Sequence, residues 1–170
     1  MLFRSDPYSS LNPRRRIGQS LIEGPVRHGA SDSDARRRVA ELLEHVGLQP
    51  SSMNRFPHEF SGGQRQRICI ARALALEPDI IVADEAVSAL DVTVQAQVLE
   101  LFLSLQRDLG FAMLFITHDL RVASNICNRI AVMNRGQVVE TGDTQSIFQH
   151  SQHEYTRRLI AALPSDLSDK

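Results

Sequence analysis

Two short apolar runs separated by a helical pattern constrain the fold of this chain more than any other feature. Residues 79–84 and 111–117 each contain a continuous apolar run, as parallel strands do when helices cover both faces of the sheet. Between them, Asp91 is suited to cap a helix over about 92–109 that ends at Gly110. A strand, a helix and a second strand in this order predict parallel pairing and therefore an α/β core.

The segment before these strands predicts a helical region. A short helix over 17–28 is expected to break near Gly24 and Pro25, because proline interrupts a helix. Ser31 then begins a pattern that resembles a capping box, and the helix that follows carries its apolar side chains on one face until Gly47. The chain after the two strands predicts a hairpin over 129–142 and two short helices, at about 143–149 and 153–163.

Composition and charge exclude several classes of function. The chain of 170 residues fits one domain, and its net charge of −1 gives no electrostatic basis for binding nucleic acid. The two cysteines, Cys69 and Cys127, have neither metal-ligand nor redox spacing. No apolar run approaches the roughly 18 residues that a membrane span needs. Any role at a membrane is therefore expected to come through a partner.

The segment Ser61-Gly62-Gly63-Gln64 is the first candidate binding element. Two glycines let a backbone approach a ligand closely, and the helix that begins there offers unpaired N–H groups and a positive dipole end. Such an arrangement suits the γ-phosphate of ATP. The alternative is an ordinary capped helix, in which Gln64 closes a capping box with Ser61.

Carboxylates and a histidine follow the two apolar runs. Asp84 ends the first strand, where it could hold Mg²⁺, and Glu85 could orient or deprotonate an attacking water. His118 follows the second strand and could hydrogen-bond a phosphate. Each also has a plainer explanation, since acidic pairs and histidines commonly occupy turns at strand ends, and Asp91 in Ser88-Ala89-Leu90-Asp91 is a good helix cap.

In combination, these elements resemble the nucleotide-binding domains of ABC transporters. Their order and spacing match, and the stretch FSGGQRQRICIARALALEPDIIVADEAVSALDVTVQAQVL is similar to the peptide and nickel importer branch in particular. Two flanking segments agree, namely DPYSSLNPR and HEYTRRLIAALP, with Glu154 where that branch usually has proline. The resemblance runs from Asp6 to about Pro164.

The resemblance implies a fold and a role for each candidate residue. The fold would be a P-loop NTPase (RecA-like) α/β domain, here a fragment of an ABC nucleotide-binding domain with its helical signature subdomain. ATP and Mg²⁺ would be the cofactors. Asp84 would hold magnesium, Glu85 would be the catalytic carboxylate and His118 the switch histidine. The other implied site residues are the signature that contacts the nucleotide of an opposing subunit (Ser61, Gly62, Gly63 and Gln64) and the D-loop (Ser88, Ala89, Leu90 and Asp91).

The sequence departs from the family in two places. It contains no G-x-x-x-x-G-K-[ST] loop, the Walker A element, and its only lysine is Lys170. The glutamine expected before Asp6-Pro7 is absent, with Arg4-Ser5 in its place. We therefore expect a chain truncated at its N-terminus, inactive alone, with an unpaired sheet edge and exposed apolar surface where the missing strand would lie.

The expected organisation has four parts. Residues 1–5 are interpreted as a non-native scar. Residues 6–77 would contain the segment after the Q-loop, the helical subdomain from about 17 to 60, and the signature helix; residues 78–142 would be the RecA-like core remnant; and residues 143–170 would be a tail typical of peptide importers.

The resemblance implies an ATP-hydrolysing subunit that energises an importer of di- or oligopeptides, with nickel or glutathione as other possible substrates. Its partners would be a second ATPase subunit, two transmembrane permease subunits that meet the helical subdomain and, indirectly, a peptide-binding protein. Its place would be peripheral, on the cytoplasmic face of the bacterial inner membrane. An alternative is a non-catalytic regulatory or dimerisation module that offers only the signature face. A DNA-repair or chromosome-organising ATPase is disfavoured, because no sustained heptads and no net positive charge are present.

Overall fold

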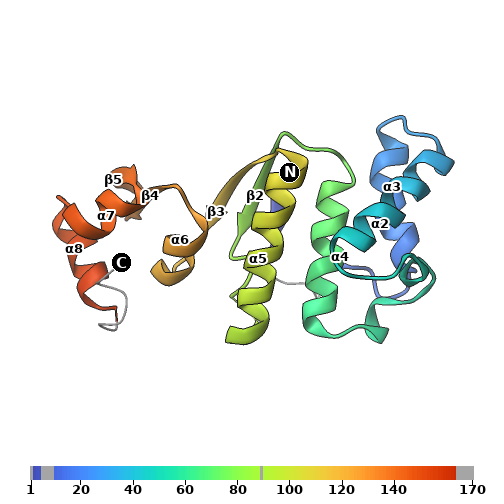
Figure 1. The fold of residues 1–170 in the computed structure, drawn as a ribbon, viewed down its shortest axis with the longest axis horizontal. Coiled ribbons are helices and arrows are strands. Elements are labelled where there is room, and N and C mark those ends of the chain that lie inside the picture. The colour runs from blue at the N-terminus through green and yellow to red at the C-terminus, as the bar shows by residue number, and fades with distance from the viewer. Residues whose placement is uncertain (1, 5–9, 89, 164–170) are drawn as a thin grey trace. The chain divides into compact units, whose positions relative to one another are not determined.

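The computed structural model describes residues 2–4, 10–88 and 90–163 (Figure 1). The chain divides into two compact units, Met1–Ile116 and Thr117–Lys170, and each is described by itself. The first unit contains β1 (Leu2–Arg4), α2 (Ile17–Arg27), α3 (Asp32–His45), two 3-10 turns (Pro50–Asn54 and Pro57–Glu59), α4 (Gly62–Leu74), β2 (Ile80–Asp84), α5 (Val92–Leu109) and β3 (Ala112–Ile116). The second contains α6 (Leu120–Ile126), β4 (Arg129–Asn134), β5 (Gln137–Asp143), α7 (Thr144–His150) and α8 (Glu154–Ala161).

A three-stranded parallel sheet forms the centre of the first unit. Its order is β1-β2-β3, and β2 pairs with β3 from Ile80 opposite Ala112 to Asp84 opposite Ile116. The predicted strand–helix–strand unit and its parallel pairing are therefore confirmed. At the other edge, β1 pairs parallel to β2, so residues 2–4 extend the sheet. Met1 and Ser5 lie outside the described residues, and the interpretation of residues 1–5 as a scar stays a prediction.

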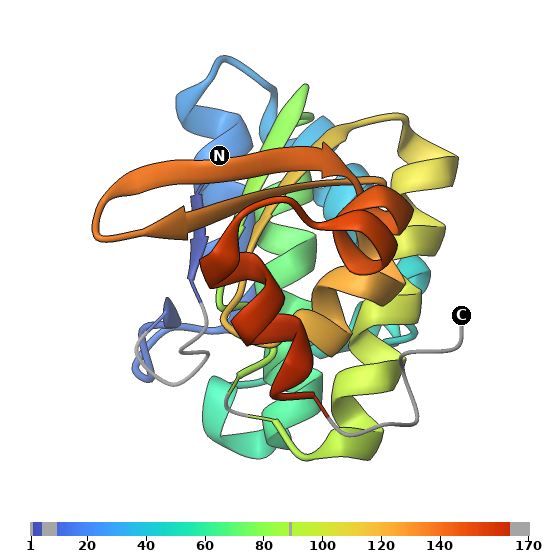
Figure 2. The same ribbon diagram turned by 90° about the vertical axis from the view of Figure 1, so that its left-hand side faces the viewer.

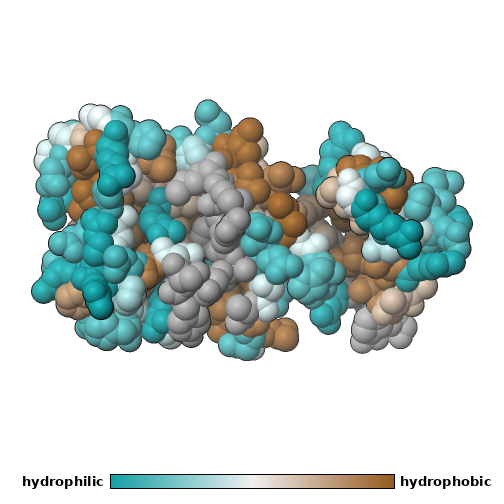
Figure 3. Space-filling model, turned by 180° about the vertical axis from the view of Figure 1, so that it is seen from behind, coloured by the Kyte–Doolittle hydropathy of each residue, from teal (hydrophilic) through white to brown (hydrophobic). Residues whose placement is uncertain are grey.

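One face of this sheet is buried and the other is exposed. Ile81 and Ala83 are fully buried, and Phe115, which shares their face, meets Phe102 of α5 edge-on with ring centroids 6.4 Å apart. On the opposite face, Ile80 and Leu114 each keep 55% of their surface exposed. Figure 3 shows this apolar surface from behind. Within the first unit taken by itself, only one face of these two strands is buried, and the expectations of strands covered on both faces and of exposed apolar surface beside a missing strand stay predictions.

Helix α2 runs without a break through Pro25, contrary to the sequence-based expectation. Proline removes one helical N–H, but Ile17, Leu21 and Pro25 are spaced four residues apart and are all buried. Gly24 lies close to Leu76, whose Cδ2 would be 3.2 Å from an added Cβ. Packing of this face therefore holds the helix together for the two residues that remain after the proline. The helix ends at Arg27, with His28 as its C-cap.

The remaining helices of the first unit begin and end as the capping signals predict. Ser31 accepts a hydrogen bond from the backbone N–H of Asp34 at 3.0 Å, and Asp91 accepts one from Val94 at 3.0 Å. Gly110, with a φ of +72°, follows the last residue of α5 in the left-handed conformation. The apolar face predicted for α3 is buried, and it consists of Ala35, Val39, Leu42, Leu43 and Val46.

The second unit is an antiparallel hairpin with three short helices (Figure 2). Strands β4 and β5 turn at Arg135 and Gly136, which both have positive φ, as the predicted turn requires. A small core joins the hairpin to α6 and α7 through Ala123, Ile130, Val132 and Ile147. Within the described residues, no helix is long and apolar enough to cross a membrane.

Candidate functional site

The Ser-Gly-Gly-Gln segment begins α4 as a capping box. The backbone N–H of Gln64 donates to Ser61 Oγ at 3.3 Å, and the backbone N–H of Ser61 donates to Gln64 Oε1 at 3.0 Å. The plainer explanation of this segment is therefore realised in the structure. It does not exclude a binding role, because Ser61 and Gln64 are exposed and the first N–H groups of α4 remain at a helix N-terminus.

An open hollow of about 520 Å³ lies beside this helix start. Residues from four segments line it: Gly47 and Leu48; Ser61, Gly62, Gly63, Gln64 and Arg67; Leu90 and Asp91; and Val94 and Gln97. Its size falls within the range of ordinary ligand pockets. The hollow therefore joins the glycine-rich segment to two of the residues predicted for the D-loop, which come 26 to 30 positions later in the chain.

Close packing explains why glycines occupy two places in the wall of the hollow. An added Cβ at Gly63 would lie 2.8 Å from Val94 Cγ1, closer than real contacts allow, so the start of α4 can approach α5 only without a side chain there. Gly47 has a φ of +74° and lies against Arg67, whose Nη1 donates to the Val46 carbonyl at 3.0 Å. Arg67 thereby brings a positive charge to the hollow.

Asp84 and Glu85 lie at the carboxyl end of β2, as predicted. Glu85 is exposed and has a φ of +49°, a left-handed conformation that is uncommon outside glycine. Its backbone is held from both sides, since its N–H donates to the Ile116 carbonyl at 2.9 Å and its carbonyl accepts from Ser88 N at 3.1 Å and Ser88 Oγ at 3.0 Å. A rare backbone conformation held by several bonds is typical of functional positions.

Within this one chain, the two carboxylates do not share the hollow with the glycine-rich segment. Among the described residues, neither Asp84 nor Glu85 lines it. Of the predicted D-loop, Leu90 and Asp91 line it, Ser88 binds Glu85, and Ala89 lies outside the described residues. The described residues also include no group of three or more His, Cys, Asp or Glu side chains that could hold a metal by themselves.

His118 is exposed and belongs to the second unit, where it precedes the cap of α6. The cap is Asp119, whose carboxylate accepts from Arg121 N at 2.9 Å, Nε at 3.1 Å and Nη2 at 2.8 Å. The Arg121 guanidinium, helped by the backbone N–H groups of Arg121 and Val122, holds the pKa of Asp119 below its ordinary value against the opposing effect of desolvation. The carboxylate therefore stabilises the start of α6 in its charged form.

We expect Asp119→Asn to reveal this charge through the pH dependence of stability. Because the folded-state pKa of Asp119 is lowered, its contribution is complete above the unfolded value of about 3.8 and is lost as the pH falls through the lower folded value. The variant keeps an acceptor for the cap but loses the charge, so it should be less stable by about 0.5 kcal/mol at pH 7. Urea unfolding of both proteins at pH 7 and pH 3 measures the difference, which should shrink at pH 3; a constant difference would contradict the assignment.

Several residues of the hollow escaped the sequence-based predictions. Gly47 and Leu48 follow the end of α3, and no local pattern links them to the glycine-rich segment. Arg67 lies three residues after Gln64, so the helical period could have placed it on the same face. Val94 and Gln97 follow the Asp91 cap at helical spacing and could have been found in the same way.

Comparisons with known proteins agree with these features. The family model described as "ABC transporter" matches residues 2–88. The chain is 60% identical over 161 residues to the glutathione import ATP-binding protein GsiA of Escherichia coli (strain K12), and 58% identical over 161 residues to GsiA of Salmonella typhimurium (strain LT2). Each alignment covers 94% of this chain and 26% of the relative, so the chain spans about a quarter of the length of these relatives.

The fold is also similar to that of a solved structure. That structure is cbiO1 from Clostridium perfringens, described as part of the ABC transporter complex cbiONQ. The TM-score is 0.79 at 26% sequence identity, and the match covers 96% of this chain and 63% of the solved chain. The predicted α/β fold of a nucleotide-binding domain fragment is therefore confirmed.

Proposed function

The chain belongs to the ABC transporter family, and from that premise we propose that it serves an importer as an ATP-binding subunit whose glycine-rich face acts on the nucleotide of a partner. The hollow beside α4 carries this proposal. It combines the helix N-terminus, the charge of Arg67 and the half-buried backbone at Gly62 and Gly63, a set of donors suited to the terminal phosphate of ATP. The similarity to glutathione importers favours a small peptide as the transported substrate.

The carboxylates at the end of β2 would serve a different nucleotide from the one at the hollow. Asp84 fits a magnesium ion, because this ion usually takes one or two carboxylates and completes its shell with phosphates and water. Glu85, held by its backbone bonds, would orient the attacking water, and His118 is proposed to hydrogen-bond a phosphate. Without a phosphate-cradling loop in its sequence, the chain should not hold ATP at these residues by itself.

A rescue experiment tests this proposal. The partner is full-length E. coli GsiA in which each signature serine is replaced by arginine. ATP bound by this partner then has no working signature segment to contact it from the opposing side. We expect this disabled partner and the present chain to be inactive separately, and their mixture to hydrolyse ATP with magnesium. Turnover by the chain alone that disappears in Glu85→Gln would overturn the proposal, and so would a mixture that stays inactive.

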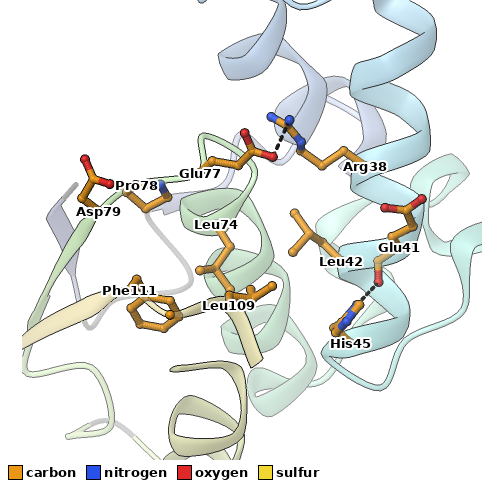
Figure 4. A pocket seen from close by; sticks show the side chains of 11 residues that line it. Arg38, Glu41, Leu42, His45, Leu74, Glu77, Pro78, Asp79, Leu109 and Phe111 are labelled. Carbon is orange, nitrogen blue, oxygen red and sulfur yellow. Dashed lines mark hydrogen bonds and ion pairs between the residues drawn. The ribbon is translucent and has the colours of Figure 1, made fainter. Parts of the chain in front are cut away.

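A second hollow of the first unit fits the membrane partner. This pocket, of about 430 Å³, lies between α3, the end of α4 and the end of α5 (Figure 4). Leu42, Leu74 and Phe111 supply buried apolar surface, while Arg38 and Glu77 form an ion pair of 2.5 Å at its rim. An apolar interior with charged groups at the rim suits a short amphipathic helix. We propose that a permease subunit places such a helix here, with the chain peripheral at the cytoplasmic face of the membrane.

Leu109→Arg should weaken binding to the permease at least about tenfold, because it places a charge where an apolar anchor would enter. Leu109 is 45% exposed, so the fold should tolerate the change. The control is Val92→Arg, which also replaces an apolar side chain by a charged one. Val92 lies at the other end of α5 and is 83% exposed. Binding to nanodiscs that contain the permease subunits of the E. coli glutathione importer measures the effect. Equal binding by the two variants would place the partner elsewhere.

A further inference from the structure

Gln66 is a fully buried polar side chain that the proposed chemistry does not use. It lies on α4, between the glycine-rich segment and the apolar side chains that anchor the helix, and none of its surface is exposed. Ser52 and Thr156 are the other buried polar residues in the described part of the chain. A glutamine in such a place has a cost, since burying an amide is unfavourable unless its groups are paired.

The amide of Gln66 joins α4 to the turn that follows the catalytic carboxylate candidate. Its Nε2 donates to the carbonyl of Ala86, the residue directly after Glu85. Its Oε1 is buried and finds no partner among the described residues. Only half of the amide is therefore paired, and methionine, of similar shape, would fill the space without leaving a buried acceptor. Stability alone does not explain a glutamine here.

The turn held by Gln66 continues into the wall of the hollow. The Glu85 carbonyl accepts from Ser88, the Val87 carbonyl accepts from Leu90 N at 3.2 Å, and Leu90 and Asp91 line the hollow opposite the start of α4. Ala86 and Val87 are buried, so the turn cannot move toward solvent as a loose loop. The hydrogen bond from Gln66 thus fixes Ala86 to α4, and the bonds of the turn connect Ala86 to Leu90 and Asp91 at the hollow.

We propose that Gln66 is a positioning residue that locks the turn at Glu85–Ser88 to α4, so that the catalytic end of β2 and the glycine-rich face move as one body. This rests on the proposed function, in which these two elements contact different nucleotides of an assembled pair. The lock then couples the two nucleotides within one subunit. A shift of α4 when the hollow receives a phosphate is carried through Ala86 to the backbone of Glu85.

The first arm of the test uses the chain alone and needs no activity. In Gln66→Met, the hydrogen exchange protection of the Ser88 and Leu90 amides should fall at least about tenfold, because about one hydrogen bond is lost. The protection of the Val98 amide in α5 should change by less than about twofold. Gln106→Met, the same change on α5, should leave Ser88 and Leu90 unaltered. A uniform loss across Ser88, Leu90 and Val98 would make the role of Gln66 merely structural and would overturn the proposal.

A second variant restores the donor by pH. Gln66→Glu keeps the shape of the side chain, but its ionised carboxylate cannot donate to the Ala86 carbonyl; the protonated acid can, and burial raises the pKa of such a group. The amide resonances of Ala86 and Val87 should therefore move toward their wild-type positions as the pH is lowered, with a single titration. Resonances that do not respond to pH would contradict the lock.

The second arm uses the rescue mixture. Gln66→Met should lower kcat of the rescued turnover about tenfold, because Leu90 and Asp91 in the wall of the hollow would no longer be held to α4. KM for ATP should stay within about twofold, because the partner holds the nucleotide. Unchanged kcat together with unchanged exchange would refute the proposal. If the wild-type mixture shows no turnover, the proposed function fails, and the exchange and pH experiments decide the lock by themselves.

Discussion

Ser61→Arg should abolish the rescue of a disabled ABC partner, lowering the turnover of the mixture at least about 100-fold. The side chain of Ser61 lines the hollow next to Gly62 and Gly63, and an arginine there would project into space that the partner's phosphate needs. It would also stand near Arg67 with the same charge, and juxtaposed like charges at an interface cost several kcal/mol, enough for such a loss. Steady-state ATP hydrolysis at fixed partner concentration measures the effect.

Two further variants distinguish a blocked hollow from a loss of folded structure in Ser61→Arg. Ser61→Ala removes the acceptor for Gln64 N–H without adding bulk, so it should cost about 1 kcal/mol of stability and leave most of the turnover. Glu85→Gln should leave rescue unchanged, because in this mixture the carboxylate faces a position without a phosphate-cradling loop. Rescue that survives Ser61→Arg, or disappears in Glu85→Gln, would show that the wrong face of the chain had been assigned to the partner.

Phe102→Ala should lower the free energy of unfolding of the first unit by about 3–5 kcal/mol. Phe102 is 1% exposed and meets Phe115 of β3 edge-on, so this ring packs α5 against the buried face of the sheet. The effect should be large because the opposite face, with Ile80 and Leu114, is exposed and contributes little burial. Urea unfolding with an unchanged m-value measures the loss.

The same helix provides the control for this change. Val92→Ala, at the exposed beginning of α5, should alter stability by less than about 0.5 kcal/mol. Phe102→Leu keeps most of the apolar volume and should cost less than Phe102→Ala. If truncation of Phe102 were no more costly than truncation of Val92, the sheet would be held by other contacts than those with α5.

Local patterns predicted the elements of this chain well where one residue decides the structure. Ser31, Ser61 and Asp91 each cap the expected helix, and Gly110 ends α5 where predicted. These signals work because a cap depends on bonds within a few residues. The helix break predicted near Pro25 does not occur, because the helix face around it is buried. This burial depends on residues far along the chain, Leu76 among them, and no local pattern reveals it.

The candidate site was predictable as a set of residues but not as an arrangement. The spacing of the motifs placed Asp84, Glu85 and the glycine-rich segment at strand and helix ends, where the structure has them. That Gly47 and Arg67 complete the hollow, and that Gln66 reaches Ala86, depends on how α3, α4 and β2 pack. Such contacts join residues far apart in the sequence and leave no local period. The roles of the site residues themselves stay predictions.

The number of ATP molecules held by one assembled pair tests the central claim most directly. The partner would be E. coli GsiA carrying arginine at each signature serine and glutamine at each catalytic glutamate, so that bound ATP is retained rather than hydrolysed. The partner is mixed with an excess of the present chain and ATP, and free nucleotide is then removed rapidly. The retained ATP should equal the number of partner nucleotide sites that have bound a copy of this chain. The residues of the chain itself should retain no further ATP. ATP retained in excess of the partner's sites would show that Asp84 and Glu85 hold nucleotide by themselves and would contradict the account.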